Sequence, residues 1–290
     1  MDHGNKRSTK NIGTAFFLNL VFTLIEIVGG LWTNSLAILS DAIHDLGDCI
    51  SLGMAWIMER ISGKERDQKY SYGYRRFSIM GAIITSAVLI LGSLIIIFRA
   101  VPRLTTPEST DSLGMIYLAI LGIAFNGFAA WRLHGGTSLN ERTVFLHLLE
   151  DVLGWASILI GAILMYLFEW YIVDPILSIG IALFVLYNAI RNLKLSADIF
   201  LQKTPQPYDL DEIAGLIKRD KDVRDVHDLH LWTMDGEFHI LTAHIVVKLD
   251  DLSWHEMIQL KRHLKRELKG IGIHHATLEL ETSEKECEID

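Results

Sequence analysis

Six segments of this 290-residue chain are apolar over the length that a helix needs to cross a lipid bilayer. About 20 helical residues span the roughly 30 Å of hydrocarbon in a membrane. The segments are residues 12–32, 36–58, 77–98, 113–131, 144–168 and 172–190. Because a segment in lipid must satisfy its own backbone hydrogen bonds, this pattern predicts an α-helical membrane protein with six transmembrane helices.

The basic residues between these segments predict on which side of the membrane each end of the chain lies. Lysines and arginines gather in the amino-terminal tail, in the loops around residues 59–76 and 132–143, and after the sixth segment. The opposite side has only Arg99 and Arg103. Since basic loops remain in the cytoplasm, both termini are predicted to be cytoplasmic. The short loops favour a bacterial inner (plasma) membrane as the location.

The chain changes character after residue 203. Pro205 and Pro207 interrupt the last helix, and a polar segment follows. The pattern beyond them predicts a helix at 209–219, strands at 223–234 and 237–249, a helix at 253–268 and a strand at 274–281. This αββαβ order is typical of a small ferredoxin-like α+β domain. We therefore expect a membrane domain over residues 1–203 and a cytoplasmic domain over residues 204–290.

The second apolar segment contains four ionisable side chains within eight residues, namely Asp41, His44, Asp45 and Asp48. Their spacing places all four on one face of a helix. A charged group at the centre of a bilayer costs roughly 3 kcal/mol on insertion scales, so this face must point into the helical bundle or into a wet cavity. Ionisable residues within a membrane helix are a functional-site hypothesis in their own right.

The fifth segment repeats part of this pattern. His44 and Asp48 form one H-x-x-x-D pair, and His147 and Asp151 form a second pair with the same spacing. Two imidazole nitrogens and two carboxylate oxygens from facing helices make a four-coordinate site of the kind that Zn²⁺ accepts in tetrahedral geometry. Interhelical hydrogen bonds and a proton relay are the alternatives, but neither requires the same spacing twice. The sequence therefore favours a metal site.

These motifs together resemble the cation diffusion facilitators, a family of metal-ion/proton antiporters. The resemblance extends from about residue 11 to residue 281 and is carried by GGLWTNSLAILSDAIHDLGD, HLLEDVLGW, VDPILSIGIALFVLYNA and VHDLHLWTM. It implies that His44, Asp48, His147 and Asp151 form a transport site for Zn²⁺, with Cd²⁺ or Co²⁺ often tolerated. It also implies a homodimer in which the tail domains pack together.

The resemblance further implies that His227, His244, His274 and Glu281 bind zinc in the cytoplasmic domain. Strand alternation constrains this set, because His227 and His230 are predicted to point to opposite faces of their strand, as are His239 and His244. At most one residue of each pair can then join a given site. The alternative is a histidine-rich domain without a metal.

The loop between the second and third apolar segments departs from some members of the family, which have an additional metal site there. Tyr70 and Tyr74 occupy the positions where that site needs histidines, and Asp67 alone cannot hold a divalent ion. We therefore expect no metal site in this loop.

Three functions remain open for such a chain. The first is secondary-active export of a divalent metal, above all Zn²⁺, in exchange for protons; the second is a membrane-bound metal sensor, and the third is a passive divalent-cation channel. A channel does not need a closed four-ligand site, which would hold Zn²⁺ too tightly for fast flow. A sensor should have a further catalytic or DNA-binding domain. We therefore predict export.

Two classes of function are not expected. The sequence contains no nucleophile–base constellation and no phosphate-binding glycine loop, so we predict that the chain is not an enzyme. The net charge of −8 argues against nucleic acid as a partner. The expected partners are the lipid bilayer, divalent metal ions, protons and a second copy of the chain.

Overall fold

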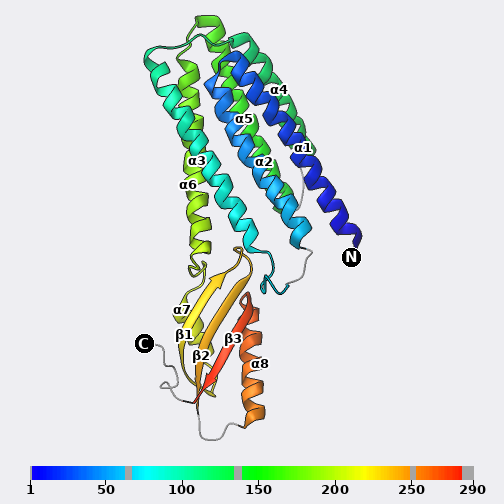
Figure 1. Cartoon of the computed structure of the whole chain (residues 1–290), viewed down its shortest axis with the longest axis vertical. Helices are drawn as coiled ribbons and strands as arrows, with labels where there is room; N and C mark the ends of the chain where they lie inside the picture. Colours follow the sequence, from blue (N-terminus) through cyan, green and yellow to red (C-terminus); the bar gives the residue numbers. More distant parts are fainter. Residues whose placement is uncertain (1, 63–66, 134–138, 249–252, 283–290) are drawn as a thin grey trace. The chain divides into compact units, whose positions relative to one another are not determined.

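The structure is a computed structural model that describes residues 2–62, 67–133, 139–248 and 253–282. The chain divides into two compact units, each described separately below. The first unit comprises Met1–Glu65 and Gly81–Leu193, and the second comprises Arg66–Met80 and Lys194–Asp290. The elements of both units are labelled in Figure 1.

Six long helices occupy the six predicted apolar segments. Their bounds are α1 (Asp2–Thr33), α2 (Leu36–Ser62), α3 (Arg76–Thr105), α4 (Ser112–Leu133), α5 (Leu139–Phe168) and α6 (Val173–Phe200). Within the described residues, four stretches are long and apolar enough to cross a membrane, and these lie in α3, α4, α5 and α6. In α1, Asn19–Thr33 is a shorter apolar stretch. The predicted helical membrane fold is confirmed.

Four of these helices form a bundle, in which α2 packs chiefly on α1 and α5 packs chiefly on α4 (Figure 1). Contacts between α1 and α4, and a short contact between α2 and α5, join the two pairs. Phe22, Ile38, Met115 and Trp155 are buried between them. Gly122 allows the close approach of α4 and α5, because a Cβ atom there would lie 2.3 Å from the Trp155 ring.

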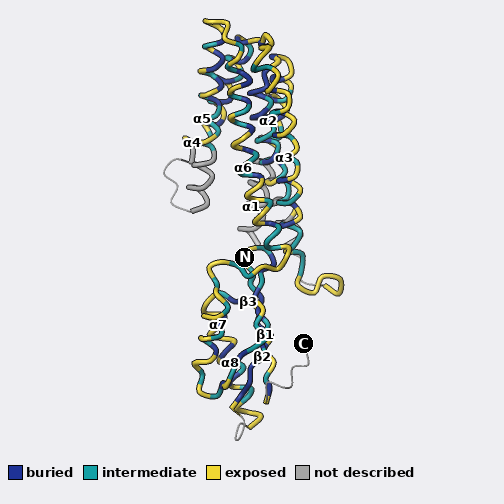
Figure 2. Tube along the Cα trace, turned by 90° about the vertical axis from the view of Figure 1, so that its left-hand side faces the viewer, coloured by how far each residue is buried: buried dark blue, intermediate teal, exposed yellow. Residues whose placement is uncertain are grey.

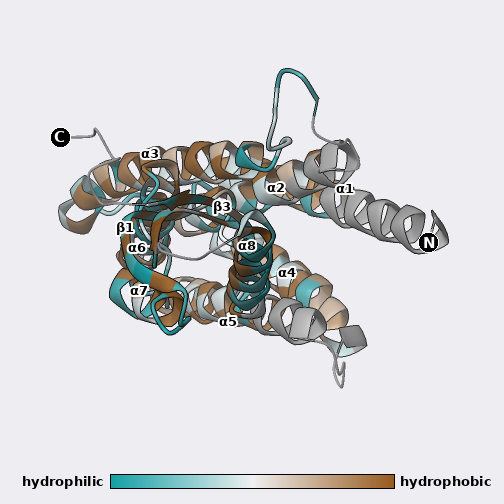
Figure 3. Cartoon of the chain, turned by 90° about the horizontal axis from the view of Figure 1, so that it is seen from below, coloured by the Kyte–Doolittle hydropathy of each residue, from teal (hydrophilic) through white to brown (hydrophobic). Residues whose placement is uncertain are grey.

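The outward-facing side chains of this unit are largely apolar, as expected for helices surrounded by lipid. Figure 2 shows buried residues on the inner sides of the helices and exposed residues on the outer sides. Leu91, Phe98, Trp131 and Tyr187 are among the large side chains that are more than half exposed. Figure 3 shows hydrophobic residues along α3. Such apolar surfaces require a non-aqueous environment.

The second unit contains the predicted αββαβ domain. Its elements are α7 (Leu210–Ile217), β1 (Val223–Thr233), β2 (His239–Val247), α8 (Trp254–Gly270) and β3 (Ile273–Glu281). The strand order is β1-β2-β3, with β1 and β2 antiparallel and β2 and β3 parallel. The hairpin turns at the predicted Asp235–Gly236, where Gly236 has a φ of +96° that suits a residue without a Cβ atom.

Both helices of this domain cover the same face of the sheet, as Figures 1 and 2 together show. The core between them contains alternate residues of β2, including Leu241, Ala243 and Ile245, and one stripe of α8 formed by Leu260, Leu264 and Leu268. The alternate residues of β2 that include His244 therefore lie on the opposite face of the sheet. That face carries one of the candidate metal sites.

Candidate metal sites

The membrane site brings together three of the four predicted ligands. His44 Nε2 lies 3.8 Å from Asp48 Oδ2, one turn further along α2, and 3.9 Å from Asp151 Oδ1 on α5. The histidine is therefore between two carboxylates that come from two different helices. All three side chains keep some exposure, from 11% for Asp151 to 29% for Asp48.

His147 is the fourth predicted ligand, and its side chain lies outside the described part of the structure. Its backbone belongs to α5, one helical turn before Asp151. Residues four apart share a face of a helix, so this position stays a predicted ligand position.

Asp41 and Asp45 are more buried than the ligand candidates on the same helix, at 7% and 6% exposure. The carboxylate of Asp41 lies against Gly154 of α5, since its Oδ1 atom is 3.6 Å from the point where a Cβ atom of that glycine would stand. The backbone oxygen of Asp45 accepts a hydrogen bond from the Asn19 amide of α1 at 3.4 Å. These residues lie where α2 meets its neighbouring helices.

Asp174 fixes one end of α2, and this role was not predicted from the sequence. Its carboxylate accepts hydrogen bonds from the Ser35 hydroxyl at 2.6 Å and from the backbone N–H groups of Leu36 and Ala37 at 2.9 and 3.2 Å. These N–H groups belong to the first turn of α2, which has no partners of its own within the helix. The sequence signal that could have indicated this role is a carboxylate, Asp174, near the start of the apolar segment 172–190.

The cytoplasmic site lies on the face of the sheet opposite the helices. His227 of β1 pairs with His244 of β2, and Glu281 ends the neighbouring strand β3. Glu281 Oε1 is 2.6 Å from His244 Nδ1, and Glu281 Oε2 is 3.1 Å from His227 Nε2. One ligand atom from each of the three residues lies within 4.8 Å of the others.

This donor set fits Zn²⁺, which is commonly bound by histidine nitrogens and carboxylate oxygens. Glu281 is only 5% exposed. Both ring nitrogens of His227 are buried, and neither makes a well-aligned hydrogen bond with another described residue, although Glu281 Oε2 lies 3.1 Å from Nε2. Buried polar atoms are normally satisfied, and an ion held between the two imidazoles and the carboxylate would give one of these nitrogens a partner.

A β-bulge changes which histidines of β1 share a face. His227 opposes His244, whereas His230 opposes Thr242, so three positions of β1 span two positions of β2. The bulge contains Asp228, which has a φ of +48°. His227 and His230 therefore lie on the same face, and the prediction that they face opposite sides is wrong, because strict alternation fails at a bulge. Asp228 Oδ1 is 2.8 Å from His230 Nε2.

His274 is not brought to the other three predicted ligands of this domain. It lies near the start of β3, seven residues from Glu281, which is about 23 Å along a strand. Its ring stacks on Phe238, with 5.1 Å between centroids, and its Nδ1 accepts the backbone N–H of His239 at 3.4 Å. Burial, together with the neighbouring His274, lowers the pKa of His239 below its usual value.

The loop before α3 uses Asp67 for hydrogen bonds within the protein. Asp67 Oδ1 accepts the backbone N–H groups of Lys69 and Tyr70 at 2.8 and 2.7 Å, and Oδ2 accepts the Tyr74 hydroxyl at 2.7 Å. The last of these hydrogen bonds raises the pKa of Tyr74. Both oxygens of this carboxylate thus accept hydrogen bonds from the protein, and the absence of a metal site in this loop stays a prediction.

Two family models match the chain, and together they cover most of it. The model for the cation efflux transmembrane domain matches residues 13–201. The model for the cytoplasmic domain of cation efflux proteins matches residues 205–283.

Several bacterial proteins are similar over nearly the whole chain. A cadmium, cobalt and zinc/H(+)-K(+) antiporter of Bacillus subtilis is 35% identical, over 97% of this chain and 91% of its own length. The metal cation efflux system protein CzcD of Cupriavidus metallidurans is 33% identical, over 97% and 88%. The zinc transporter ZitB of Escherichia coli is 32% identical, over 92% and 85%. These relatives are transporters of metal cations, not enzymes.

Proposed function

Because the chain belongs to the cation diffusion facilitator family, we propose that it exports Zn²⁺ from the cytoplasm in exchange for protons. Its relatives are named for zinc, cadmium and cobalt, so Cd²⁺ and Co²⁺ are the alternative substrates. Both termini face the cytoplasm in this proposal, and the membrane is the bacterial inner membrane. The protein works as a homodimer joined through its cytoplasmic domains.

The transported ion binds to His44, Asp48, His147 and Asp151. The observation that carries this assignment is the position of His44 Nε2, which lies within 4 Å of carboxylate oxygens from both α2 and α5. Carboxylates and an imidazole are ligands that Zn²⁺ accepts, and such groups remain inside a membrane only where they have a function or a partner.

Proton exchange follows from the chemistry of these ligands. An imidazole or a carboxyl group must lose its proton before it can coordinate a metal, so protons and metal compete for one site. The ordinary pKa of an imidazole is about 6.5, so this competition falls within the physiological pH range. Metal arriving from the cytoplasm displaces protons, and protons arriving from the other side displace the metal.

The packing of the bundle supports a site that can open. The ligands come from α2 and α5, but α2 packs chiefly on α1 and α5 packs chiefly on α4. The two helix pairs can therefore shift slightly relative to each other at the site while the more extensive packing within each pair is kept. Such rigid-body motion is a common way for a membrane transporter to expose one site to two sides.

Two other functions are less well supported. A passive channel would not need ligands this close to one another. A sensor that binds Zn²⁺ only at His227, His244 and Glu281 would have no use for the pairs within the membrane, and the similar proteins are named as transporters.

Flux into proteoliposomes with an imposed pH gradient tests the proposal. Purified protein should carry Zn²⁺ at a rate that depends on the gradient, and Asp151→Asn should abolish this flux. Glu150→Gln is the matched control, since it removes the neighbouring exposed carboxylate of α5 and should leave the flux within about twofold.

The other outcomes of this experiment separate the alternatives. Flux that ignores the pH gradient would identify a channel or uniporter. Absence of flux from wild-type protein that still binds Zn²⁺ in its cytoplasmic domain would favour the sensor. Equal losses in Asp151→Asn and Glu150→Gln would refute the assignment of the ligands.

A further inference from the structure

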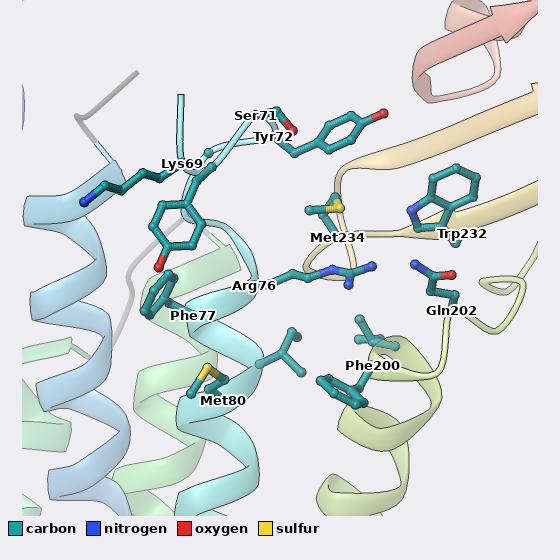
Figure 4. Close-up of a pocket in the computed structure, with 14 residues that line it drawn as sticks. Lys69, Ser71, Tyr72, Arg76, Phe77, Met80, Phe200, Gln202, Trp232 and Met234 are labelled. Carbon is teal, nitrogen blue, oxygen red and sulfur yellow. The ribbon is translucent and has the colours of Figure 1, made fainter. Parts of the chain in front are cut away.

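A cavity of about 730 Å³ lies within the second unit of the chain (Figure 4). Fourteen residues line it, and all of them belong to Arg66–Met80 or Lys194–Asp290. They come from the loop before α3, the first turns of α3, the end of α6, and the hairpin of the sheet. A volume of this size is within the range of sites that bind small molecules.

The charge of this cavity has one sign. Lys69 and Arg76 are among its lining residues, and no aspartate or glutamate is. Arg75 is paired elsewhere, because its guanidinium donates to Asp235 at 2.9 Å and lies 4.6 Å from the centroid of the Phe238 ring. An anion is therefore the ligand that the charges of the cavity favour.

Arg76 is the residue best placed to hold that anion. Figure 4 shows its side chain extending between Met234, Trp232 and Gln202. The Nε atom of Arg76 is buried and has no hydrogen-bond acceptor among the residues that the structure describes. A buried donor without an acceptor is costly, and the planar guanidinium matches the oxygens of a phosphate group.

The remaining lining residues are mostly apolar, and they lie at the ends of two membrane helices. Phe77 and Met80 belong to the first turns of α3, and Phe200 is the last residue of α6. Trp232 adds an aromatic ring from β1. An apolar wall beside cationic groups at the end of a membrane helix is the environment that a phospholipid headgroup and the start of its acyl chains require.

We propose that this cavity binds an anionic phospholipid, with Arg76 on the phosphate, Lys69 near the headgroup, and the acyl chains leaving past Met80 and Phe200. The lipid belongs to the leaflet at the level of the first turn of α3. Its binding does not depend on the metal sites, so the proposal stands or falls separately from the proposed transport.

Native mass spectrometry of the full-length protein tests this proposal. Delipidated protein in detergent is mixed with phosphatidylglycerol or with phosphatidylcholine of the same acyl chains. Wild-type protein should retain phosphatidylglycerol preferentially, and Arg76→Gln should lower that retention roughly fivefold, as expected for one basic residue near a lipid surface. Lys69→Gln, in an exposed loop position, should lower it in the same direction, and Arg76→Lys should restore part of it.

Arg191→Gln is the matched control, because Arg191 is an exposed basic residue of α6 that does not line the cavity. It should leave the retention unchanged within twofold. Equal retention of the two lipids, or equal losses in Arg76→Gln and Arg191→Gln, would overturn the proposal. So would displacement of phosphatidylglycerol by glycerol 3-phosphate at a similar concentration, since a soluble phosphate would then be the ligand.

Discussion

The two candidate metal sites differ in how their ligands are held. In the membrane, His44 and Asp151 meet across the short contact between α2 and α5, two helices that each pack chiefly on another partner. In the cytoplasmic domain, His227 and His244 are cross-strand partners, and Glu281 lies on the next strand. The backbone hydrogen bonds of the sheet fix these separations, whereas no backbone hydrogen bond joins two packed helices. The first arrangement suits binding followed by release, and the second suits retention.

The largest expected effect comes from a substitution that disrupts the membrane site and leaves the cytoplasmic site intact. Asp48→Asn should lower pH-driven Zn²⁺ flux by at least about 100-fold, because a tetrahedral site that loses a charged ligand binds metal far more weakly. The same protein should still carry zinc in its cytoplasmic domain. Flux and bound metal are measured on one preparation, the second by elemental analysis. Loss of both together would contradict the separation of the two sites.

The next effect concerns the zinc ion that we expect the cytoplasmic domain to bind. In full-length protein with the Asp48→Asn change, Glu281→Gln should weaken zinc binding about 10- to 100-fold, since Glu281 lies within 3.1 Å of both histidines. Glu279→Gln is the control, because Glu279 is 68% exposed and 3.7 Å from His244. Equilibrium dialysis against a zinc buffer measures both. A similar loss in the two variants would indicate a general charge effect instead of ligation.

A smaller effect tests the hairpin of the second unit. Burial raises the pKa of Asp235, but the backbone N–H of Phe238 and the Arg75 guanidinium outweigh it and hold the pKa below the ordinary 3.8. The resulting stabilisation is therefore present above that ordinary pKa, and it is lost as the pH falls through the lower pKa of the folded state. Asp235→Asn should cost roughly 1–2 kcal/mol at neutral pH and progressively less in acid.

Unfolding followed at several pH values checks this expectation. Glu237→Gln, in the same turn and exposed, should change the free energy of unfolding by less than about 0.5 kcal/mol. If the destabilisation caused by Asp235→Asn grew as the pH fell, the pKa of Asp235 would not be lowered in the folded state, which would contradict this expectation.

The smallest expected effect concerns α8, which covers the face of the sheet opposite the candidate metal site. Ser253 and Glu256 form a capping box at the start of α8, and hydrogen bonds from Ser253 lower the pKa of Glu256. Ser253→Ala should destabilise the domain by about 1 kcal/mol, and Ser253→Asp should restore most of it. Neither change should alter zinc affinity, since α8 covers the opposite face. Reduced zinc binding in Ser253→Ala would show that the site depends on the cap.

Features that depend on neighbours in the chain could be predicted from the sequence, and those that depend on pairing between elements could not. The spacing of His44 and Asp48 alone indicates a shared helix face, and the apolar segments alone predict the membrane helices. The last membrane helix, α6, continues to Phe200, ten residues past the predicted end. Residues 191–200 mix charged and polar residues with apolar ones, and they contain no proline or glycine to stop a helix. Hydropathy marks the membrane, not the end of the helix.

The sequence-based predictions were wrong or incomplete where strands pair or where helices distant in the sequence meet. Alternation along β1 predicted opposite faces for His227 and His230, but the bulge at Asp228 adds one residue and reverses the pattern beyond it. Asp174 holds the first turn of α2 across 138 residues of sequence, and no local pattern reports such a contact. The position of His274 beside His239 likewise depends on the register between β2 and β3.

The three hydrogen bonds to Asp174 fix the start of α2, so any tilt of this helix would turn about that end. His44 lies eight residues from Leu36, and Ser62 lies 26 residues from it. At 1.5 Å per residue, these positions are about 12 and 39 Å along the helix from its fixed end. A tilt of about 10° around that point displaces His44 by about 2 Å and the far end of the helix by about 7 Å. A swing too small to disturb the anchored end is thus enough to change a metal–ligand distance by a whole bond length.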